Sequence, residues 1–137
     1  MFPDILWETP KKDAYNAGAQ WSEDKGITVK RSANPKEATV EANGLVDGQP
    51  TSNHYSLLIY DDVVTLESVT SPEMMLKTTD ALALSYNLGA HGGRRRFIGT
   101  RYHYNDTYAT LIERKTATPR LHPATIDGTM EGEPVFL

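Results

Sequence analysis

The sequence predicts an α/β fold built on a mainly parallel sheet with flanking helices. Segments with strand and helix character alternate in its second half, an order typical of parallel strands joined by helical connections. An apolar run at residues 55–60 predicts a strand buried on both faces inside the sheet. The candidate strands are short and number only four, so the sheet is thin. The chain has 137 residues, which predicts one domain or part of one.

The composition is that of a globular protein, with 39% hydrophobic and 23% charged residues. A net charge of −4 argues against the chain-wide basic surface of a dedicated nucleic-acid-binding domain. The sequence has no cysteine, which excludes disulfides and thiolate metal sites and fits an intracellular protein. No apolar run approaches the ~20 residues that a membrane span needs, and the N-terminus lacks a signal-peptide pattern. These features predict a cytoplasmic protein without membrane contact.

The first half of the chain predicts few regular elements. Prolines and glycines interrupt residues 1–26, which are expected to form an irregular N-terminal segment. Strands are predicted at residues 26–31 and 38–42 because both runs carry β-branched residues. A loop rich in Gly, Pro, Ser and Asn at residues 47–54 then leads into the buried strand at residues 55–60.

The first helix is predicted from a capping box. Thr70 would be the N-cap, Pro72 would lie in the first turn, and Glu73 would take the third helical position. The helix is expected to end near Gly89. One stripe of it carries four residues that should face the core: Met75, Thr79, Leu82 and Tyr86.

The remaining elements follow a glycine pair. Gly92 and Gly93 are expected to break the chain before a strand at residues 94–100. Asn105 would be the N-cap of a second helix. One face of that helix carries Tyr108, Leu111 and Ile112. Residues 116–137 contain three prolines and two glycines and are expected to form an exit segment.

Two acids, Asp61 and Asp62, directly follow the apolar strand. They would lie at its carboxyl end, where open α/β sheets bind ligands. Carboxylates are also the ligands that Mg²⁺ prefers. On this pattern alone, the simpler interpretation is preferred: a strand terminus with two solvated acids.

A second candidate site follows the strand at residues 94–100. Gly99, Thr100 and Arg101 form a small polar turn that could hold a phosphate or a water, with an arginine beside it. Taken alone, a glycine-containing turn with Arg101 on the surface is the preferred interpretation. The two segments together are more specific, because parallel strands would bring both to one edge of the sheet.

Residues 48–54, 57–65, 98–108 and 119–125 resemble the ATPase region of tailed-phage large terminase subunits. The resemblance covers nearly all of the chain and keeps the order and spacing of that family. The most specific motifs in this resemblance are Gly-Thr-Arg-Tyr-His and Asn-Asp-Thr-Tyr. The resemblance implies a partial P-loop NTPase fold of the ASCE type.

The resemblance also implies a role for each candidate residue. Asp61 would be the Walker B acid that binds Mg²⁺. Asp62 takes a position where this class often has Glu, and it would be the catalytic residue that orients the attacking water. Gly99, Thr100 and Arg101 would form motif III, which contacts the nucleotide and couples hydrolysis to DNA movement.

One expected motif is missing from the sequence. The phosphate-binding pattern Gly-x-x-x-x-Gly-Lys-Ser/Thr occurs nowhere, so the Walker A strand, loop and helix are lacking. Residues 27–115 would therefore be a partial ATPase domain with Walker B and motif III, and residues 116–137 would lead toward a missing nuclease domain. The chain alone is expected to hydrolyse ATP negligibly.

The implied function is that of an ATP-driven motor that packages double-stranded DNA into procapsids. Its implied partners are ATP with Mg²⁺, duplex DNA, the capsid portal protein and the small terminase subunit, in a ring of identical subunits when full length. Such a virus-encoded protein would work in the host cytoplasm, transiently at the procapsid portal.

Two alternatives stay open. One is a metal-dependent nuclease fragment in which Asp61, Asp62 and a further acid such as Asp106 hold two ions. The other is a non-catalytic remnant that only binds partners. The run at residues 94–96, three arginines, could contact DNA phosphates or could be a solvated lead-in to the strand.

Overall fold

The computed structural model describes residues 21–22, 24–32 and 35–135. Most of the predicted N-terminal segment, residues 1–20, lies outside the described residues. Two of the described elements are short 3-10 helices, η1 and η2. In chain order the elements are β1 (Trp21–Ser22), β2 (Gly26–Ile27), β3 (Tyr55–Asp61), η1 (Glu67–Val69), α2 (Pro72–Ser85), η2 (Tyr86–Leu88), β4 (Gly89–Ile98) and α3 (Thr107–Glu113).

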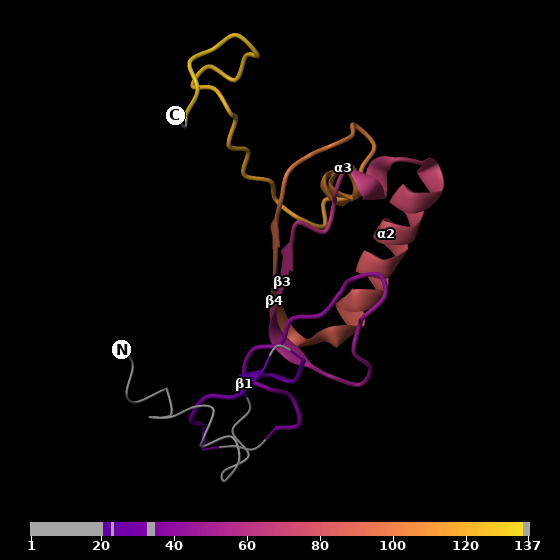
Figure 1. Ribbon diagram of the computed structural model, residues 1–137, viewed down its shortest axis with the longest axis vertical. Coiled ribbons are helices and arrows are strands. Elements are labelled where there is room, and N and C mark those ends of the chain that lie inside the picture. The colour runs from indigo at the N-terminus through magenta and orange to yellow at the C-terminus, as the bar shows by residue number, and fades with distance from the viewer. Residues whose placement is uncertain (1–20, 23, 33–34, 136–137) are drawn as a thin grey trace.

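A parallel pair of strands, β3 and β4, forms the centre of the molecule. The helix α2 connects them and lies along one face of the pair, while α3 lies at the end where both strands finish (Figure 1). The predicted α/β content and the predicted parallel pairing are therefore both present. The sheet is smaller than expected, because β3 and β4 form a two-stranded sheet of their own.

The strands predicted at residues 26–31 and 38–42 do not join this sheet. Only Gly26–Ile27 forms a strand, and it pairs antiparallel with Trp21–Ser22. Val40 contributes an isolated antiparallel bridge to Ile27, whose N–H donates to the Val40 carbonyl at 2.8 Å. A single bridge leaves the ladder too short for a strand, so these predictions are wrong about the sheet to which the segments belong.

The prediction that β3 is buried on both faces is also wrong. Tyr60 is 6% exposed, but Leu57 and Ile59 are 48% and 58% exposed. Side chains alternate between the two faces of a strand, and the described structure covers only the face toward α2. From Leu57 to Asp61, the even-numbered positions of β3 therefore face inward and the odd-numbered ones outward.

Gly92 and Gly93 do not break the chain before the strand; they lie within β4. The register changes along the pair: Tyr55 lies opposite Gly89, but Leu57 lies opposite Arg94. The extra residues of β4 between these two points form a bulge. Gly92 has φ +74°, and a Cβ on Gly93 would meet the Ala90 carbonyl oxygen at 2.8 Å. The glycines permit a bulge that side chains would oppose, and the strand then ends at Ile98 rather than at residue 100.

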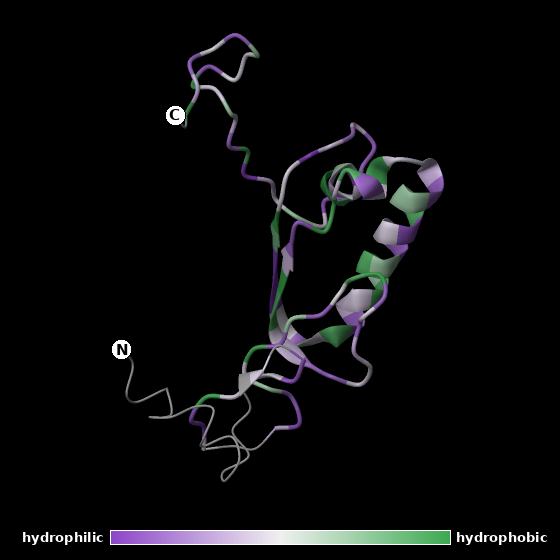
Figure 2. Ribbon diagram, in the orientation of Figure 1, coloured by the Kyte–Doolittle hydropathy of each residue, from purple (hydrophilic) through white to green (hydrophobic). Residues whose placement is uncertain are grey.

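The start of α2 is shifted by one residue from the prediction. Ser71, not Thr70, is the N-cap: its backbone is extended and its hydroxyl accepts the Met74 N–H at 3.2 Å. Pro72 is then the first helical residue and Glu73 the second, so no capping box forms. Apolar and polar residues share the length of α2 (Figure 2), and its buried positions are Thr78, Leu82 and Ser85. Of the predicted stripe, Leu82 alone is fully buried.

The core joins β3, α2 and α3. Tyr60, Val64, Leu82, Tyr108 and Leu111 are its buried apolar members. The rings of Tyr60 and Phe97 stack across the two strands at 4.9 Å between centroids. Burying one side chain such as Leu82 contributes about 1.5–3 kcal/mol, so this small cluster stabilises the parallel pair against α2 and α3.

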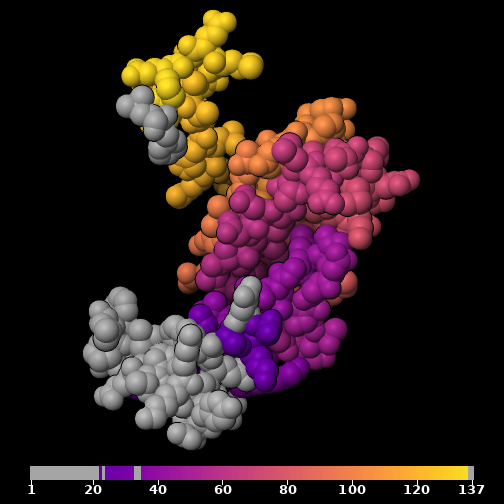
Figure 3. Space-filling model, viewed as in Figure 1, coloured from indigo at the N-terminus to yellow at the C-terminus, as the bar shows by residue number. Residues whose placement is uncertain are grey.

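The segment after α3 extends away from the rest of the chain, as Figures 1 and 3 both show. A loop within it closes on itself, since the Ile126 N–H donates to the Glu133 carbonyl at 2.8 Å and the Val135 N–H to the Ala124 carbonyl at 2.9 Å. Within residues 21–22, 24–32 and 35–135, no helix has the length and apolar character to cross a membrane.

Candidate functional site

The two predicted site segments come together at one end of the parallel pair. Asp61 is the last residue of β3 and lies opposite Ile98, the last residue of β4. The Asp62 N–H continues the ladder by donating to the Ile98 carbonyl at 3.0 Å. Gly99 and Thr100 follow directly, so the acids and the glycine-containing turn leave the sheet side by side.

The two acids are exposed and differ in backbone conformation. Asp61 alternates with Leu57 and Ile59, so it belongs to the face that α2 does not cover. Asp62 has φ +45°, in the left-handed region, and begins the turn after the strand. Within the described part of the chain, neither carboxylate accepts a hydrogen bond or forms an ion pair. Their oxygens are free to bind water or a cation.

Tyr108 lies between the two strand ends, although it belongs to α3. Its hydroxyl donates to the Ile98 carbonyl at 3.0 Å. Burial raises the pKa of Tyr108 above its ordinary value, and the nearby charge of Asp62 raises it further, while backbone groups of Val63 and Val64 act in the opposite direction. Tyr108 therefore stays protonated and ties the last carbonyl of β4 to α3.

The glycine at position 99 is required by this tyrosine. A Cβ on Gly99 would overlap the Tyr108 hydroxyl and lie 2.9 Å from Cζ of the same ring. The turn after β4 can pass over Tyr108 only because residue 99 has no side chain. The Gly-Thr-Arg sequence thus has a packing reason that is independent of any nucleotide.

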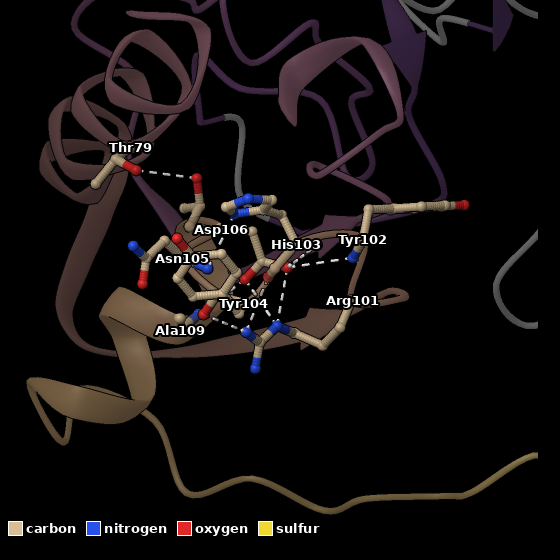
Figure 4. A network of polar contacts seen from close by, with 9 residues as sticks. Thr79, Arg101, Tyr102, His103, Tyr104, Asn105, Asp106 and Ala109 are labelled. Atoms are coloured by element: carbon tan, nitrogen blue, oxygen red, sulfur yellow. Dashed lines mark hydrogen bonds and ion pairs between the residues drawn. The ribbon is translucent and has the colours of Figure 1, made fainter. Parts of the chain in front are cut away.

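Arg101 is bound to the protein itself. Its Nε lies 2.7 Å from Oδ1 and 2.8 Å from Oδ2 of Asp106, and its Nη2 donates to the carbonyls of His103 and Tyr104 at 3.0 Å each. Figure 4 shows the guanidinium folded back over the turn at residues 101–106. All of these contacts close the turn, so Arg101 holds the loop after β4 in shape.

Asp106 is the centre of this network and is fully buried, with 0% exposure. Its Oδ1 accepts the Ala109 N–H at 2.9 Å, and Oδ2 lies within 3.3 Å of the Tyr102 N–H. Asp106 is therefore the N-cap of α3, and the prediction that Asn105 caps this helix is wrong. A buried carboxylate that binds several protein donors satisfies the helix terminus better than the exposed amide of Asn105.

A hydroxyl pair connects this loop to α2. The side chains of Thr79 and Thr107 lie 2.9 Å apart, and Thr107 is 2% exposed. Figure 4 shows Thr79 reaching from α2 toward the start of α3. The helix that joins β3 to β4 is thereby connected to the turn that follows β4.

The donors present at the strand ends fit Mg²⁺ in part. Asp61 and Asp62 offer carboxylate oxygens, and Mg²⁺ sites in proteins often use only one or two carboxylates together with phosphates and waters. Within the described ranges, no group of three or more His, Asp or Glu could hold a metal. Asp106 is not available as a third acid, because its oxygens already bind Arg101 and backbone N–H groups.

A wide, open groove of about 1230 Å³ runs along the unpaired edge of β3. Its walls come from β3, from the loop at residues 42–50 and from α2, and it includes Asp61 and Asp62. Gly99, Thr100 and Arg101 do not line it. The structure therefore places the two predicted segments at one sheet end without enclosing them in a common pocket.

Sequence reasoning missed the parts played by Asp106 and Tyr108. It named Asp106 as a possible third metal ligand and placed Tyr108 on one face of the helix. The local signal was ambiguous, because Asn105 and Asp106 are adjacent and both residue types are favoured N-caps. Nothing in the spacing indicates that Arg101 would fold back onto that same carboxylate.

Together, the fold and the site define a β-α-β unit with two free acids at the end of its first strand, β3. The sequence matches no family model, and it matches none of the curated proteins or solved structures with which it was compared.

Proposed function

We propose that this chain is the central part of a DNA-packaging ATPase similar to tailed-phage large terminase subunits. One observation carries the proposal: the parallel register sets Asp61 beside Ile98, so the acids proposed as Walker B lie next to the turn proposed as motif III. In an ATPase of this type, both elements must lie at the carboxyl ends of adjacent strands to act on one nucleotide. Antiparallel pairing of β3 and β4 would have put the two elements at opposite ends of the sheet.

Each residue has a role in the proposed reaction. Asp61 would hold Mg²⁺, which neutralises charge on the β- and γ-phosphates when it is bound. Asp62 would accept a hydrogen bond from the attacking water and orient it. Gly99 and Thr100 would contact the phosphate of the nucleotide and couple its hydrolysis to DNA movement. Arg101 would act as a positioning residue, since its guanidinium holds the loop through Asp106.

In this proposal the chain works within a larger assembly. The function is to pump double-stranded DNA into a procapsid, in a ring of identical subunits at the capsid portal, with the small terminase subunit presenting the DNA. The place of action would be the host cytoplasm. The nucleotide phosphates would also need a phosphate-binding loop, which these 137 residues do not contain.

The metal part of the proposal can be tested on the chain as it is, with Mn²⁺ as a paramagnetic substitute for Mg²⁺. In nuclear magnetic resonance spectra, Mn²⁺ should broaden the amide signals of Asp61, Asp62, Gly99 and Thr100 first. Asp61→Asn should remove this local broadening. Asp80→Asn, a matched change at an exposed acid on α2, should not. Broadening spread evenly over all exposed acids would contradict an ion site at the strand ends.

The catalytic part needs a phosphate-binding loop in a second polypeptide. Mixing this chain with a P-loop-bearing segment of a large terminase should give Mg²⁺-dependent ATP hydrolysis that either segment alone lacks. Asp61→Asn should reduce this rate at least ~100-fold, because the charge that holds the ion is lost. If Asp61→Asn leaves a restored rate unchanged, Asp61 is not the Walker B acid and the non-catalytic alternative is preferred.

The nuclease alternative is weakened by the state of Asp106. A third acid was required for a two-ion site, and this carboxylate is fully buried and bound by Arg101. Cleavage of plasmid DNA by the chain with Mn²⁺ and no nucleotide would reverse that conclusion.

A further inference from the structure

Among residues 21–22, 24–32 and 35–135, nothing covers the face of the β3–β4 sheet opposite α2. Register and alternation place five outward-facing residues on it, together with Asp61 at its end. We define the open face by these five residues: Leu57, Ile59, Arg94, Arg96 and Ile98. The three apolar members are 48%, 58% and 57% exposed, in the order Leu57, Ile59 and Ile98, and both arginines are exposed.

The covered face establishes this assignment independently. Phe97 stacks on Tyr60, and the guanidinium of Arg95 lies 4.3 Å from the centroid of the Tyr86 ring. Arg95 and Phe97 therefore point toward α2. Their neighbours in β4, Arg94 and Arg96, must point to the other side.

Charge and apolar surface lie side by side on the open face. Leu57 is the cross-strand partner of Arg94, and Ile59 is the partner of Arg96. Neither Arg94 nor Arg96 has a carboxylate partner in the described chain, where the ion pairs join Lys77 to Asp47 and Arg101 to Asp106. An apolar column on β3 thus runs beside a column of unpaired positive charge on β4.

Parallel sheets are found almost only with both faces covered, and the usual cover is a helix. We propose that the open face is the docking site for an amphipathic helix of a partner protein, whose apolar stripe is flanked by carboxylates. The stripe would cover Leu57, Ile59 and Ile98. The flanking carboxylates would pair with Arg94 and Arg96, which complement them in charge.

Two other occupants fit less well. A second copy joined by a two-fold axis would bring equivalent surfaces together, and its Arg94 and Arg96 would oppose the same arginines. Duplex DNA would satisfy both arginines but would leave Leu57, Ile59 and Ile98 against a polar, hydrated surface. An acidic amphipathic helix satisfies both kinds of residue.

The experiment uses two labelled peptides of about 18 residues, or five helical turns, with the same leucine stripe. Glutamates flank the stripe in one peptide and lysines in the other. Fluorescence anisotropy with the full chain should show the acidic peptide binding at least ~10-fold more tightly than the basic one. Equal affinities, or no binding of either peptide, would overturn the proposal.

Charge exchange tests whether the open face is responsible. Arg94→Glu together with Arg96→Glu should reverse the preference toward the basic peptide, and Arg94→Gln with Arg96→Gln should abolish it. A matched control changes two exposed arginines elsewhere, Arg114→Glu with Arg120→Glu, and should leave the preference within about twofold. Circular dichroism identifies the folded variants. If the Arg94 and Arg96 variants keep the preference for the acidic peptide, the peptide binds elsewhere and the proposal is wrong.

Two further results would assign the face differently. Tighter binding of a duplex DNA probe than of the acidic peptide, lost in the Arg94→Gln and Arg96→Gln variant, would make it a nucleic-acid surface. A dimer in sedimentation that Ile59→Ser dissolves would make it a contact between copies. Either result would rule out a partner helix as the ligand of the open face. Neither measurement depends on ATP hydrolysis, so the docking site and the proposed ATPase are tested independently.

Discussion

The Nε atom of Arg101 lies 2.7 Å from Oδ1 of Asp106, a carboxylate with no exposure to solvent. The pair closes the loop between β4 and α3, and the same carboxylate caps α3 through the Ala109 N–H. One acid therefore serves as a charge partner and as a helix cap. The loop at the end of the sheet should be among the least tolerant of substitution.

Asp106→Ala should lower the free energy of unfolding by about 2–4 kcal/mol. The change removes the N-cap and leaves buried N–H groups without an acceptor, while the half-exposed Arg101 regains water. Asn105→Ala is the matched control and should stay within about 0.5 kcal/mol, because the Asn105 side chain caps nothing. Urea denaturation measures both. A larger loss from the Asn105 change would restore Asn105 as the cap.

Gly99→Ala should destabilise the protein by about 1–3 kcal/mol, since the new methyl group would overlap Tyr108. The two positions should also be coupled. In the Tyr108→Phe background, which removes the overlapping hydroxyl, the same glycine change should cost less. A double-mutant cycle in urea measures the coupling, and strictly additive losses would show that the two residues do not meet.

Ser71→Ala should cost about 1 kcal/mol of stability, because the Ser71 hydroxyl accepts the Met74 N–H at the start of α2. Thr70→Ala should cost less than about 0.5 kcal/mol, since that hydroxyl binds only an exposed carbonyl one turn earlier. Chemical denaturation distinguishes the two positions. The reverse order would show that the helix begins one residue earlier.

Stability should fall at high pH through Tyr55. Burial, and second to it the hydrogen bond to the Glu41 carboxylate, raise the pKa of this phenol to about 12. A pKa that is higher in the folded chain contributes stability that is complete below about pH 10, the ordinary value for tyrosine, and is lost as the pH rises toward 12.

Measuring the free energy of unfolding between pH 9 and pH 12 tests this, in wild type and in Tyr55→Phe. The decline with pH should be shallower in the variant because one contributing phenol is gone. Equal slopes would mean that Tyr55 titrates normally.

The sequence predicted the elements that rest on strong local patterns. The apolar run that became β3, the helix that became α2 and the parallel direction of β3 and β4 were all expected, because periodicity and strand-helix alternation report them directly. Both helix caps were misplaced by one residue. Neighbouring Thr-Ser and Asn-Asp pairs offer two candidate caps each, and only backbone geometry selects between them.

Tertiary arrangement accounts for the remaining differences. The burial of β3 was overestimated because an apolar run cannot reveal how many layers cover a sheet, and Leu57 and Ile59 remain exposed. For the site, the meeting of Asp61 with the turn after β4 followed from parallel pairing. The contact between Arg101 and Asp106 could not be predicted, because it depends on how a six-residue loop folds back on itself.

The left-handed backbone at Asp62 limits which residues can occupy that position. Short polar side chains such as Asp and Asn tolerate φ near +45°, whereas longer and branched ones are disfavoured there. This gives a steric reason for aspartate, rather than a longer acid, at this position. An Asp62→Glu replacement would lengthen the side chain at the expense of the turn, so a longer acid here would first require a different path for the chain as it leaves β3.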